Sequence, residues 1–417
     1  MSAAAAEASR DAVSRVATES YGRLVATLAA RLGDLAAAED ALSDALTDAL
    51  VSWPRRGIPA NPAAWLLVAA RRNATDAARR AGRGRAALAE LERMAQGVTD
   101  SADLSWPDER LKLLMVCAHP AIDSGVRTPL MLQVIFRLDV AAIARAYLIS
   151  PAAMEQRLVR AKAKIRLAAI PFDIPGPDEL PERLIDVQRA VYAAFTAGRD
   201  EAAVEAAEAD TLRRASLQLA GWLVELLPHE PECRGLLALL CFSESRVSPA
   251  PPGGERPFIP LDEQDPNEWD ATLIERGERE LALASALRQP GPFQIEAAIQ
   301  SAHAERRRSG ETPWPAIVHL YDRLLELRPT IGAAVARAAA VLNAVGPEAA
   351  LAALAQLEAQ PVRAYQPYWV VRANALATID RRASEEAFHI AIGLTESAAT
   401  RAFLERRRRA ACGAPAE

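Results

Sequence analysis

An all-α fold with more than one domain is predicted by three features of this sequence. Apolar residues recur at three- and four-residue spacing along most of the chain, and alanine and leucine dominate it. No segment alternates apolar and polar residues as a half-buried strand would. The chain has 417 residues, of which 51% are hydrophobic and 25% charged, so it can bury real cores and suggests two or three domains.

Breaks rich in proline, glycine and small polar residues divide the helical pattern into units. They predict a first helical unit over residues 10–85, a linker over 86–107 and a second unit over 108–170. A long helical region follows over 180–417, and its largest break is SPAPPGGERPFIPLDEQD from Ser248.

The composition excludes several classes of protein. No stretch approaches 18 uninterrupted apolar residues, and the first residues have neither a basic nor a strongly apolar segment, so we expect no membrane span, no export signal and a cytoplasmic protein. Four cysteines do not make a disulfide framework, and Cys117 and His119 are too close together for a usual zinc pair. Cys117 is therefore expected to be buried, and Cys233 and Cys241 are expected in helix cores. Because the histidines are scattered, we expect no catalytic residues, no metal, no cofactor and no enzymatic activity.

An acidic segment, DLAAAEDALSDALTD, begins at Asp34 in the first unit. Asp40, Asp44 and Asp48 are four residues apart, and like charges at that spacing slightly destabilise an isolated helix. A basic partner surface that covers them would explain the arrangement. The alternative is a plain acidic face in contact with water.

A basic segment follows in the same unit, although the formal net charge of the chain is −5. Residues 67–85 hold six arginines against one acid, Asp76, and Pro62 opens the expected helix. Helical spacing places Arg72, Asp76, Arg79, Arg80 and Arg83 on one exposed side. An acidic protein with compact basic patches suggests a local contact with a polyanion. The alternative is an ordinary ladder of surface ion pairs.

A second basic segment lies in residues 151–166, which contain five basic residues and one acidic residue. Ser150 is expected to cap its helix and Pro151 to take the first position. The apolar stripe is predicted to comprise Met154, Leu158, Ala161 and Ile165, and the opposite face Ala153, Gln156, Arg157, Arg160 and Lys164. A short helix, a turn and then such a helix is a helix-turn-helix, whose polar face could enter a DNA major groove. Many other helical hairpins share this pattern.

The long C-terminal region carries weak internal similarity. Trp314 to Leu327 is an amphipathic helix, and RAAAVL from Arg337 is followed 35 residues later by RANALA from Arg372. Second helices are expected from Pro347 to Glu358 and from Ser384 to Leu394. Helix pairs at this period are typical of tetratricopeptide-like repeats. An irregular helical bundle is the competing interpretation.

The acidic segment and the two basic segments, in this order, resemble the sigma-70 family, in particular its extracytoplasmic-function sigma factors. AAAEDALSDAL is similar to the helix that grips the clamp helices of bacterial RNA polymerase, and WLLVAARRNATDAARR to the region that melts and reads the −10 promoter element. VAAIARAYLISPAAMEQRLVRAKAKIR is similar to region 4, which binds the −35 element. The remainder resembles the subgroup with a tetratricopeptide-like C-terminal extension, through ELPERL from Glu179, LLALL from Leu236, LDEQDPNEWD from Leu261, GPFQIEAAI from Gly291 and FLERR from Phe403.

The resemblance implies roles for particular residues. The polymerase-binding residues would be Asp40, Ser43, Asp44 and Leu46. The residues at the −10 single strand would be Trp65, Arg72, Asp76, Arg79 and Arg80. The residues at the −35 duplex would be Gln156, Arg157, Arg160 and Lys164. Two positions depart from the family: Arg72 stands where most members have Asn, and Ala142 where many have Glu.

The resemblance implies a promoter-specificity subunit, not an enzyme, whose partners are core RNA polymerase and promoter DNA. The C-terminal extension would regulate or support this activity through an intramolecular or protein contact. Two other classes remain open. One is a helix-turn-helix regulator fused to a protein-interaction repeat scaffold, which would bind duplex DNA without polymerase. The other is a scaffold that binds only proteins.

Overall fold

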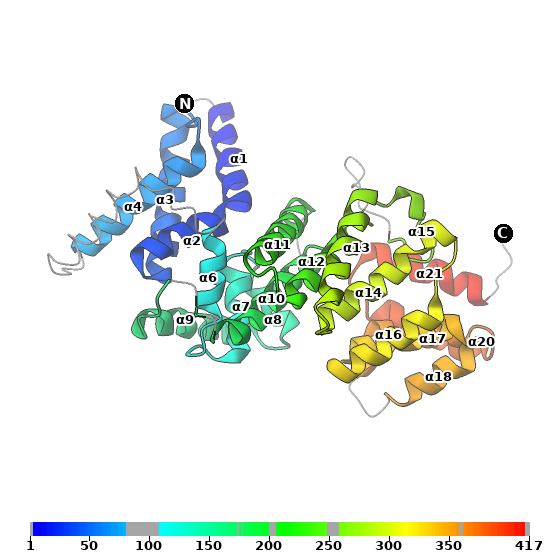
Figure 1. Cartoon of the computed structure of the whole chain (residues 1–417). Helices are drawn as coiled ribbons and strands as arrows, with labels where there is room; N and C mark the ends of the chain where they lie inside the picture. The colour runs from blue at the N-terminus through cyan, green and yellow to red at the C-terminus, as the bar shows by residue number, and fades with distance from the viewer. Residues whose placement is uncertain are drawn as a thin grey trace. The chain divides into compact units, whose positions relative to one another are not determined.

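The computed structural model describes residues 3–80, 108–172, 175–176, 178–199, 206–247, 258–357 and 362–412 (Figure 1). Within these ranges the regular secondary structure is α-helix with two short 3-10 turns and no strand, which confirms the predicted all-α class. The chain divides into two compact units, Met1–Trp222 and Leu223–Glu417. Among the described helices, none is both long and apolar enough to cross a membrane. The expected linker over 86–107 lies outside the described residues.

The first unit is built from helices α1 to α11. Their bounds are α1 Ala3–Glu19, α2 Tyr21–Leu32, α3 Leu35–Arg56, α4 Pro62–Arg80, α6 Glu109–Cys117, α7 Ser124–Val134, α8 Val140–Ala146, α9 Pro151–Leu167, α10 Leu180–Ala197 and α11 Ala206–Leu226, the last of which runs on into the second unit. Helices α1, α2 and α4 pack around α3. The buried face of α3 comprises Leu35, Ala38, Ala41, Leu42, Ala45, Ala49 and Trp53. The small side chains on this face let the neighbouring helices approach closely.

Side-chain caps fix where the helices of this unit begin. The Asp34 carboxylate accepts a hydrogen bond from Ala37 N at 3.2 Å and starts α3, and the Asn61 side chain accepts one from Ala64 N at 3.0 Å ahead of Pro62. The Ser150 hydroxyl accepts one from Ala153 N at 3.3 Å, so the predicted cap of α9 is confirmed. Each cap satisfies one of the backbone N–H groups that a helix leaves open at its start.

Helix α2 also packs closely against the segment that follows α7. A Cβ atom at Gly22 would lie 2.2 Å from the carbonyl oxygen of Ile135, so the helix can approach only because this residue is glycine. Arg137 donates a hydrogen bond to Ala17 O at 2.7 Å, and its guanidinium lies 5.1 Å from the ring centroid of Tyr21. Burial, with a smaller contribution from Glu39, raises the pKa of Tyr21 to about 12. The helices before residue 81 and those after 108 therefore share one packed core.

The second unit is a succession of helices, most of which pack against the next one, while α14 packs against α16 past the short α15. Their bounds are α12 Pro231–Glu244, η1 Pro266–Glu268, α13 Ala271–Ala286, α14 Pro292–Ala304, α15 Arg306–Ser309, α16 Trp314–Leu327, α17 Ile331–Ala344, α18 Pro347–Ala355, η2 Val362–Ala364, α19 Gln366–Leu376, α20 Arg381–Gly393 and α21 Ala398–Cys412 (Figure 1). The expected helix over Trp314–Leu327 is confirmed, and Ala338 and Ala373 in the two similar segments are both fully buried. Small residues therefore stand where these helices cross.

A carboxylate clamp joins α12 to the start of α14. Glu232 accepts hydrogen bonds from Phe293 N at 2.9 Å and from Gln294 N at 3.1 Å, and the amide of Gln294 also donates to it at 3.1 Å. A Cβ atom at Gly291 would lie 2.2 Å from the Glu232 carboxyl carbon. This contact is a structural reason for the glycine and the glutamine of GPFQIEAAI. Burial raises the pKa of Glu232, although the three hydrogen bonds act in the opposite direction.

The LDEQDPNEWD segment holds distant helices of the second unit together. Trp269 is buried between the guanidinium groups of Arg246 and Arg306, whose carbons lie 5.8 and 5.4 Å from its ring centroid. Glu263 pairs with Arg407 of α21 at 3.5 Å. In the described part of the chain no group of histidine, cysteine and acidic side chains could hold a metal ion. Within this segment Asp265 and Asp270 cap η1 and α13.

Replacing Gly22 with alanine is expected to destabilise the first unit. The added methyl group would meet the backbone of Ile135, and such overpacking costs about 1–3 kcal/mol of unfolding free energy. Gly393 is also helical but has nothing within 4 Å of an added Cβ atom, so Gly393→Ala should instead stabilise by about 0.5–1 kcal/mol. Urea unfolding of both variants measures the change in unfolding free energy. A change of the same sign in both variants would contradict the close approach of Ile135 to Gly22.

Replacing Glu232 with glutamine is expected to destabilise the second unit by about 1–3 kcal/mol, since an amide nitrogen would face a backbone N–H donor. The raised pKa means that the folded chain binds this proton more strongly than the unfolded chain. The contribution of this proton binding to the free energy of unfolding is therefore complete below the pKa of Glu232 in the unfolded chain. It is lost as pH rises through the pKa in the folded chain. Thermal unfolding across that pH range should show this component in the natural chain and not in Glu232→Gln. The exposed Glu225→Gln should change neither quantity.

Candidate nucleic-acid interface

Helix α4 presents one exposed basic face. Its buried side comprises Leu66, Ala70 and Ala78. Arg72, Asp76 and Arg79 are exposed on the side opposite, and Trp65 is half-buried on the same side. The Arg79 guanidinium lies 3.6 Å from the Asp76 carboxylate, and both side chains are more than half exposed. Arg80 ends the helix, and its side chain is outside the described part of the chain.

Contacts with α3 fix the orientation of this face. The ring centroids of Trp53 and Trp65 are 5.5 Å apart in an edge-to-face arrangement, which orients Trp65 at the start of α4. Asn73 donates a hydrogen bond to Asp48 at 3.2 Å. Asn73 therefore points toward α3, and Arg72 takes the exposed position on the basic face.

The exposed side of α3 carries the predicted acidic face. Asp40, Ser43 and Asp44 are exposed, and Leu46 is half-buried. Asp48 differs from the other two aspartates because it is bound to Asn73. Leu50 and Val51 are 43% and 57% exposed one turn further on, so the acidic face continues into an apolar patch that the sequence analysis did not identify. The spacing of the acidic residues does not predict this apolar patch.

Helix α9 has three distinct sides. The predicted apolar stripe of Met154, Leu158, Ala161 and Ile165 is buried. On one flank Lys162 pairs with Glu39 of α3 at 2.8 Å, and both side chains are less than one-fifth exposed. The other flank carries Gln156, Arg157, Arg160 and Lys164, all of them exposed. The contact with α3 therefore leaves the predicted DNA-facing flank open.

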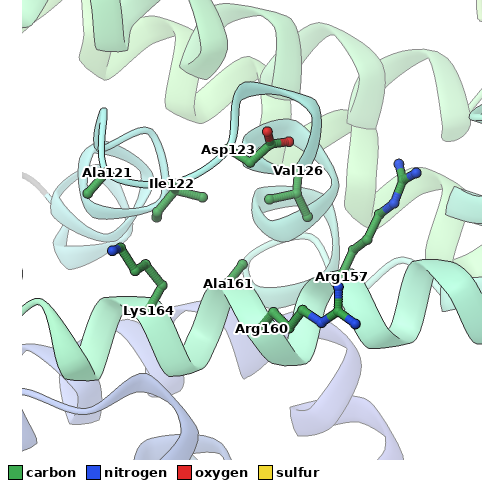
Figure 2. Close-up of a pocket in the computed structure, with 8 residues that line it drawn as sticks. All are labelled: Ala121, Ile122, Asp123, Val126, Arg157, Arg160, Ala161 and Lys164. Carbon is green, nitrogen blue, oxygen red and sulfur yellow. The ribbon is translucent and has the colours of Figure 1, made fainter.

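A pocket of about 540 Å³ lies along this open flank (Figure 2). Its lining residues are Ala121, Ile122, Asp123, Val126, Arg157, Arg160, Ala161 and Lys164. Figure 2 shows α9 as one wall and the segment leading into α7 as the other. Asp123 accepts a hydrogen bond from Gly125 N at 3.0 Å and caps α7. Three cations against one such carboxylate make the pocket suitable for an anion such as a phosphate.

The turn before α9 contains an unusual residue. Leu148 has a φ of 53° and is 93% exposed. A residue with a side chain costs about 1–2 kcal/mol in the left-handed region. Because the Leu148 side chain is exposed, burial of its apolar surface does not offset this cost. The turn brings α8 against the buried side of α9, where Ala144 and Ile143 are buried. Ala142 is half-buried and supplies no charge beside the basic flank.

Two further arginines lie close together behind the basic face of α4. The Arg31 Nη1 and Arg71 Nε atoms are buried without a hydrogen-bond partner. Burial lowers the pKa of both groups, and the charge of Arg31 further lowers the pKa of Arg71. Arg71 belongs to the basic segment, but its partial burial could be found only from the fold. The two groups add positive potential behind α4.

Three of the four cysteines have described side chains, and these three are buried as expected. Cys117, Cys233 and Cys241 are all fully buried. Burial raises the pKa of the Cys117 thiol, and it also raises that of Cys241 to about 11. These thiols are thus inert core residues.

Comparisons with known proteins agree with this geometry for the first helices. The family model of sigma-70 region 2 matches residues 17–84, which include the exposed faces of α3 and α4. A family of unknown function (DUF6596) matches residues 183–285. The chain is 36% identical over 375 residues to the uncharacterized protein R00370 of Rhizobium meliloti (strain 1021), which covers 88% of each protein. No solved structure matches.

The region 2 match supports DNA binding, and it falls on the helix that carries the exposed basic face of α4. The match over residues 17–84 supports a member of the sigma-70 family, whose members are transcription-initiation factors. Region 2 of this family implies binding to core RNA polymerase and to promoter DNA. Neither matching family model covers α6 to α9, so the role of α9 depends on its own geometry.

Replacing Arg157 or Arg160 with alanine is expected to weaken binding of duplex DNA by the complex with core polymerase. A base-reading arginine is worth about 1–3 kcal/mol, whereas a phosphate contact should lower the slope of log affinity against log salt by about 1. Arg166 is equally exposed but lies on the flank of Lys162, so Arg166→Ala is the matched control. Fluorescence anisotropy over a salt series measures both quantities. Equal losses in all three variants would show that the open flank has no special role.

Proposed function

We propose that this chain is a sigma factor of the extracytoplasmic-function type, which binds core RNA polymerase and directs it to specific promoters. The observation that carries the proposal is the sigma-70 region 2 match, because it falls on α2 to α4, where an acidic and a basic face are both exposed. In this proposal residues 10–85 are region 2, 86–107 the linker, 108–170 region 4 and 180–417 the extension.

The acidic face of α3 is the proposed docking surface for core polymerase. Asp40, Ser43 and Asp44 would meet basic groups, and Leu46 would join the apolar contact that Leu50 and Val51 extend. Exposed charges steer association and set its salt dependence, while buried apolar area limits dissociation. The adjacency of the two kinds of surface supports a specific interface rather than a solvated face.

The basic face of α4 is the proposed site for the separated −10 strand. Trp65 supplies an aromatic ring for stacking, and Arg72, Arg79 and Arg80 supply charge for the phosphates. Asp76 can accept a hydrogen bond from a base while it orients Arg79. Because Trp53 and Asp48 tie α4 to α3, polymerase bound on α3 would hold the strand-binding face in a fixed place.

Helices α8 and α9 form the proposed helix-turn-helix for the −35 duplex. The open flank of α9 would enter the major groove, with Gln156, Arg157 and Arg160 reaching base edges and Lys164 a phosphate. The −35 and −10 elements are about 25 base pairs apart, which is about 85 Å of duplex. An extended chain of residues 81–107 reaches about 90 Å. Simultaneous binding of both elements would therefore separate the two regions, which breaks the Lys162–Glu39 pair and also the packing of α2 against α6 and Ile135.

The C-terminal helices are proposed to form a tetratricopeptide-like scaffold that regulates or supports initiation. The support is the buried Ala338 and Ala373 at matching places in successive helix pairs. Such arrays present an extended surface to a protein partner or to another part of the same chain.

Run-off transcription with purified core polymerase and genomic promoter fragments tests the function directly. The double variant Asp40→Arg/Asp44→Arg is expected to weaken core binding at least tenfold, which corresponds to about 1.4 kcal/mol. Asp11 is an exposed carboxylate of α1, and Asp11→Arg should bind as the natural chain does. Affinity for core polymerase at several salt concentrations, measured beside the run-off product, gives the comparison.

The outcomes separate the proposal from its rivals. Specific duplex binding in the absence of polymerase, unaffected by the double variant, would favour a helix-turn-helix regulator fused to a scaffold. Failure of the chain to bind core polymerase at modest ionic strength would overturn the proposal.

A further inference from the structure

Arg127 of α7 lies at the centre of a buried polar network in the first unit. It is 7% exposed. Its Nε donates a hydrogen bond to Ile122 O at 2.9 Å and its Nη2 to Pro120 O at 3.2 Å. Its Nη1 donates to the Asp186 carboxylate at 3.0 Å and to Glu182 at 3.3 Å. One guanidinium therefore ties the segment before α7 to helix α10.

Asp186 is the partner that matters most in this network. Its side chain is 11% exposed, whereas that of Glu182 is 61% exposed. Water screens an exposed ion pair and leaves it little net worth. Removing one partner of a buried pair leaves the other charge without compensation, which is strongly unfavourable. The order of the Arg127 guanidinium therefore depends chiefly on Asp186.

Helix α10 belongs to the same core as α6 and α7. Leu184, Val187 and Val191 of α10 are buried, and the helix packs against both α6 and α7. Arg183 is 4% exposed and donates a hydrogen bond to Met115 O of α6 at 3.3 Å. Helix α10 opens the part of the chain that matches the family of unknown function. That part thus begins inside the unit that carries α9.

The segment that Arg127 holds is also a wall of the basic pocket. Ala121, Ile122 and Asp123 line it opposite α9, as Figure 2 shows. His119 Nδ1 accepts a hydrogen bond from Ala121 N at 3.0 Å, which fixes the start of the segment locally. The carbonyl groups of Pro120 and Ile122 depend on Arg127 for a donor. A continuous set of contacts therefore runs from Asp186 through Arg127 to the pocket.

We infer that α10 is a structural part of the DNA-reading unit, and that Asp186 is a positioning residue that sets the wall of the basic pocket through Arg127. This inference rests on the proposed function of α9. The wall sets the width of the space beside Arg157 and Arg160, which would reach base edges, and beside Lys164, which would contact a phosphate. A wall that moves leaves these cations in place but removes the surface opposite them. The extension therefore acts on promoter recognition from its first helix.

The test uses the full chain with Asp186→Ala, compared with Glu182→Ala. Hydrogen–deuterium exchange of the free protein is expected to rise over residues 119–126 in Asp186→Ala while α8 and α9 keep their protection. Affinity of the polymerase complex for promoter DNA should fall about tenfold when the −35 element is present. It should be unchanged on a template with that element scrambled. Glu182→Ala should show a smaller change in the same segment.

A second variant covers the case in which Asp186→Ala does not fold. Arg127→Lys keeps the charge beside Asp186, but one ammonium cannot also reach both carbonyl oxygens in the guanidinium geometry. It should therefore loosen residues 119–126 and weaken −35-dependent binding while core binding is unchanged.

Three results would overturn the inference. The first is that hydrogen exchange over residues 119–126 does not change in Asp186→Ala or Arg127→Lys. The second is that exchange rises evenly over α6 to α9 in both of these variants. The third is that a variant with faster exchange over residues 119–126 still binds the −35 template with the affinity of the natural chain. The exchange measurement needs neither polymerase nor DNA. If the wall responds to Asp186 but the natural chain never binds promoters, the proposed function fails and the coupling stands. If the natural chain binds promoters and the variants behave as it does, the inference alone fails.

Discussion

The open flank of α9 depends on how the other two sides of that helix are occupied. An apolar stripe at three- and four-residue spacing is buried against α7 and α8, and Lys162 is paired with Glu39 on the neighbouring side. The cations that remain cannot turn inward, because burying an unpaired charge costs far more than an ion pair returns. The basic surface is thus a consequence of packing on the opposite side.

Polar clamps perform a similar task throughout a molecule made of short helices. Helices of this length are marginal alone and take their stability from neighbours. Glu232 holds the N-terminus of α14, and Arg127 holds the segment before α7. Each clamp satisfies several backbone groups at once, so a single side chain fixes the position of a whole segment. Two of the motifs in the second unit, GPFQIEAAI and LDEQDPNEWD, accordingly take part in packing contacts.

Much of the candidate interface was accessible from the sequence. The start of α9 at Ser150 and Pro151 and its buried stripe follow from capping chemistry and helical period, both of which are local. The spacing of the aspartates did not predict that Asp48 accepts a hydrogen bond from Asn73, because Asn73 lies 25 residues away on another helix. The burial of Arg127 and the position of α10 were missed for the same reason.

Local sequence patterns were sufficient to predict the helical class, the helix caps, the apolar and charged sides of the helices and the resemblance to sigma-70 proteins. Each of these depends on residues within a few turns of one another. Which charged side chains pair with one another depends instead on the packing of distant helices. In the tertiary structure Lys162 pairs with Glu39, Arg127 is buried against Asp186, and α10 lies in the unit that carries α9. Pairing of this kind depends on distances across the core, and no period along the chain encodes them.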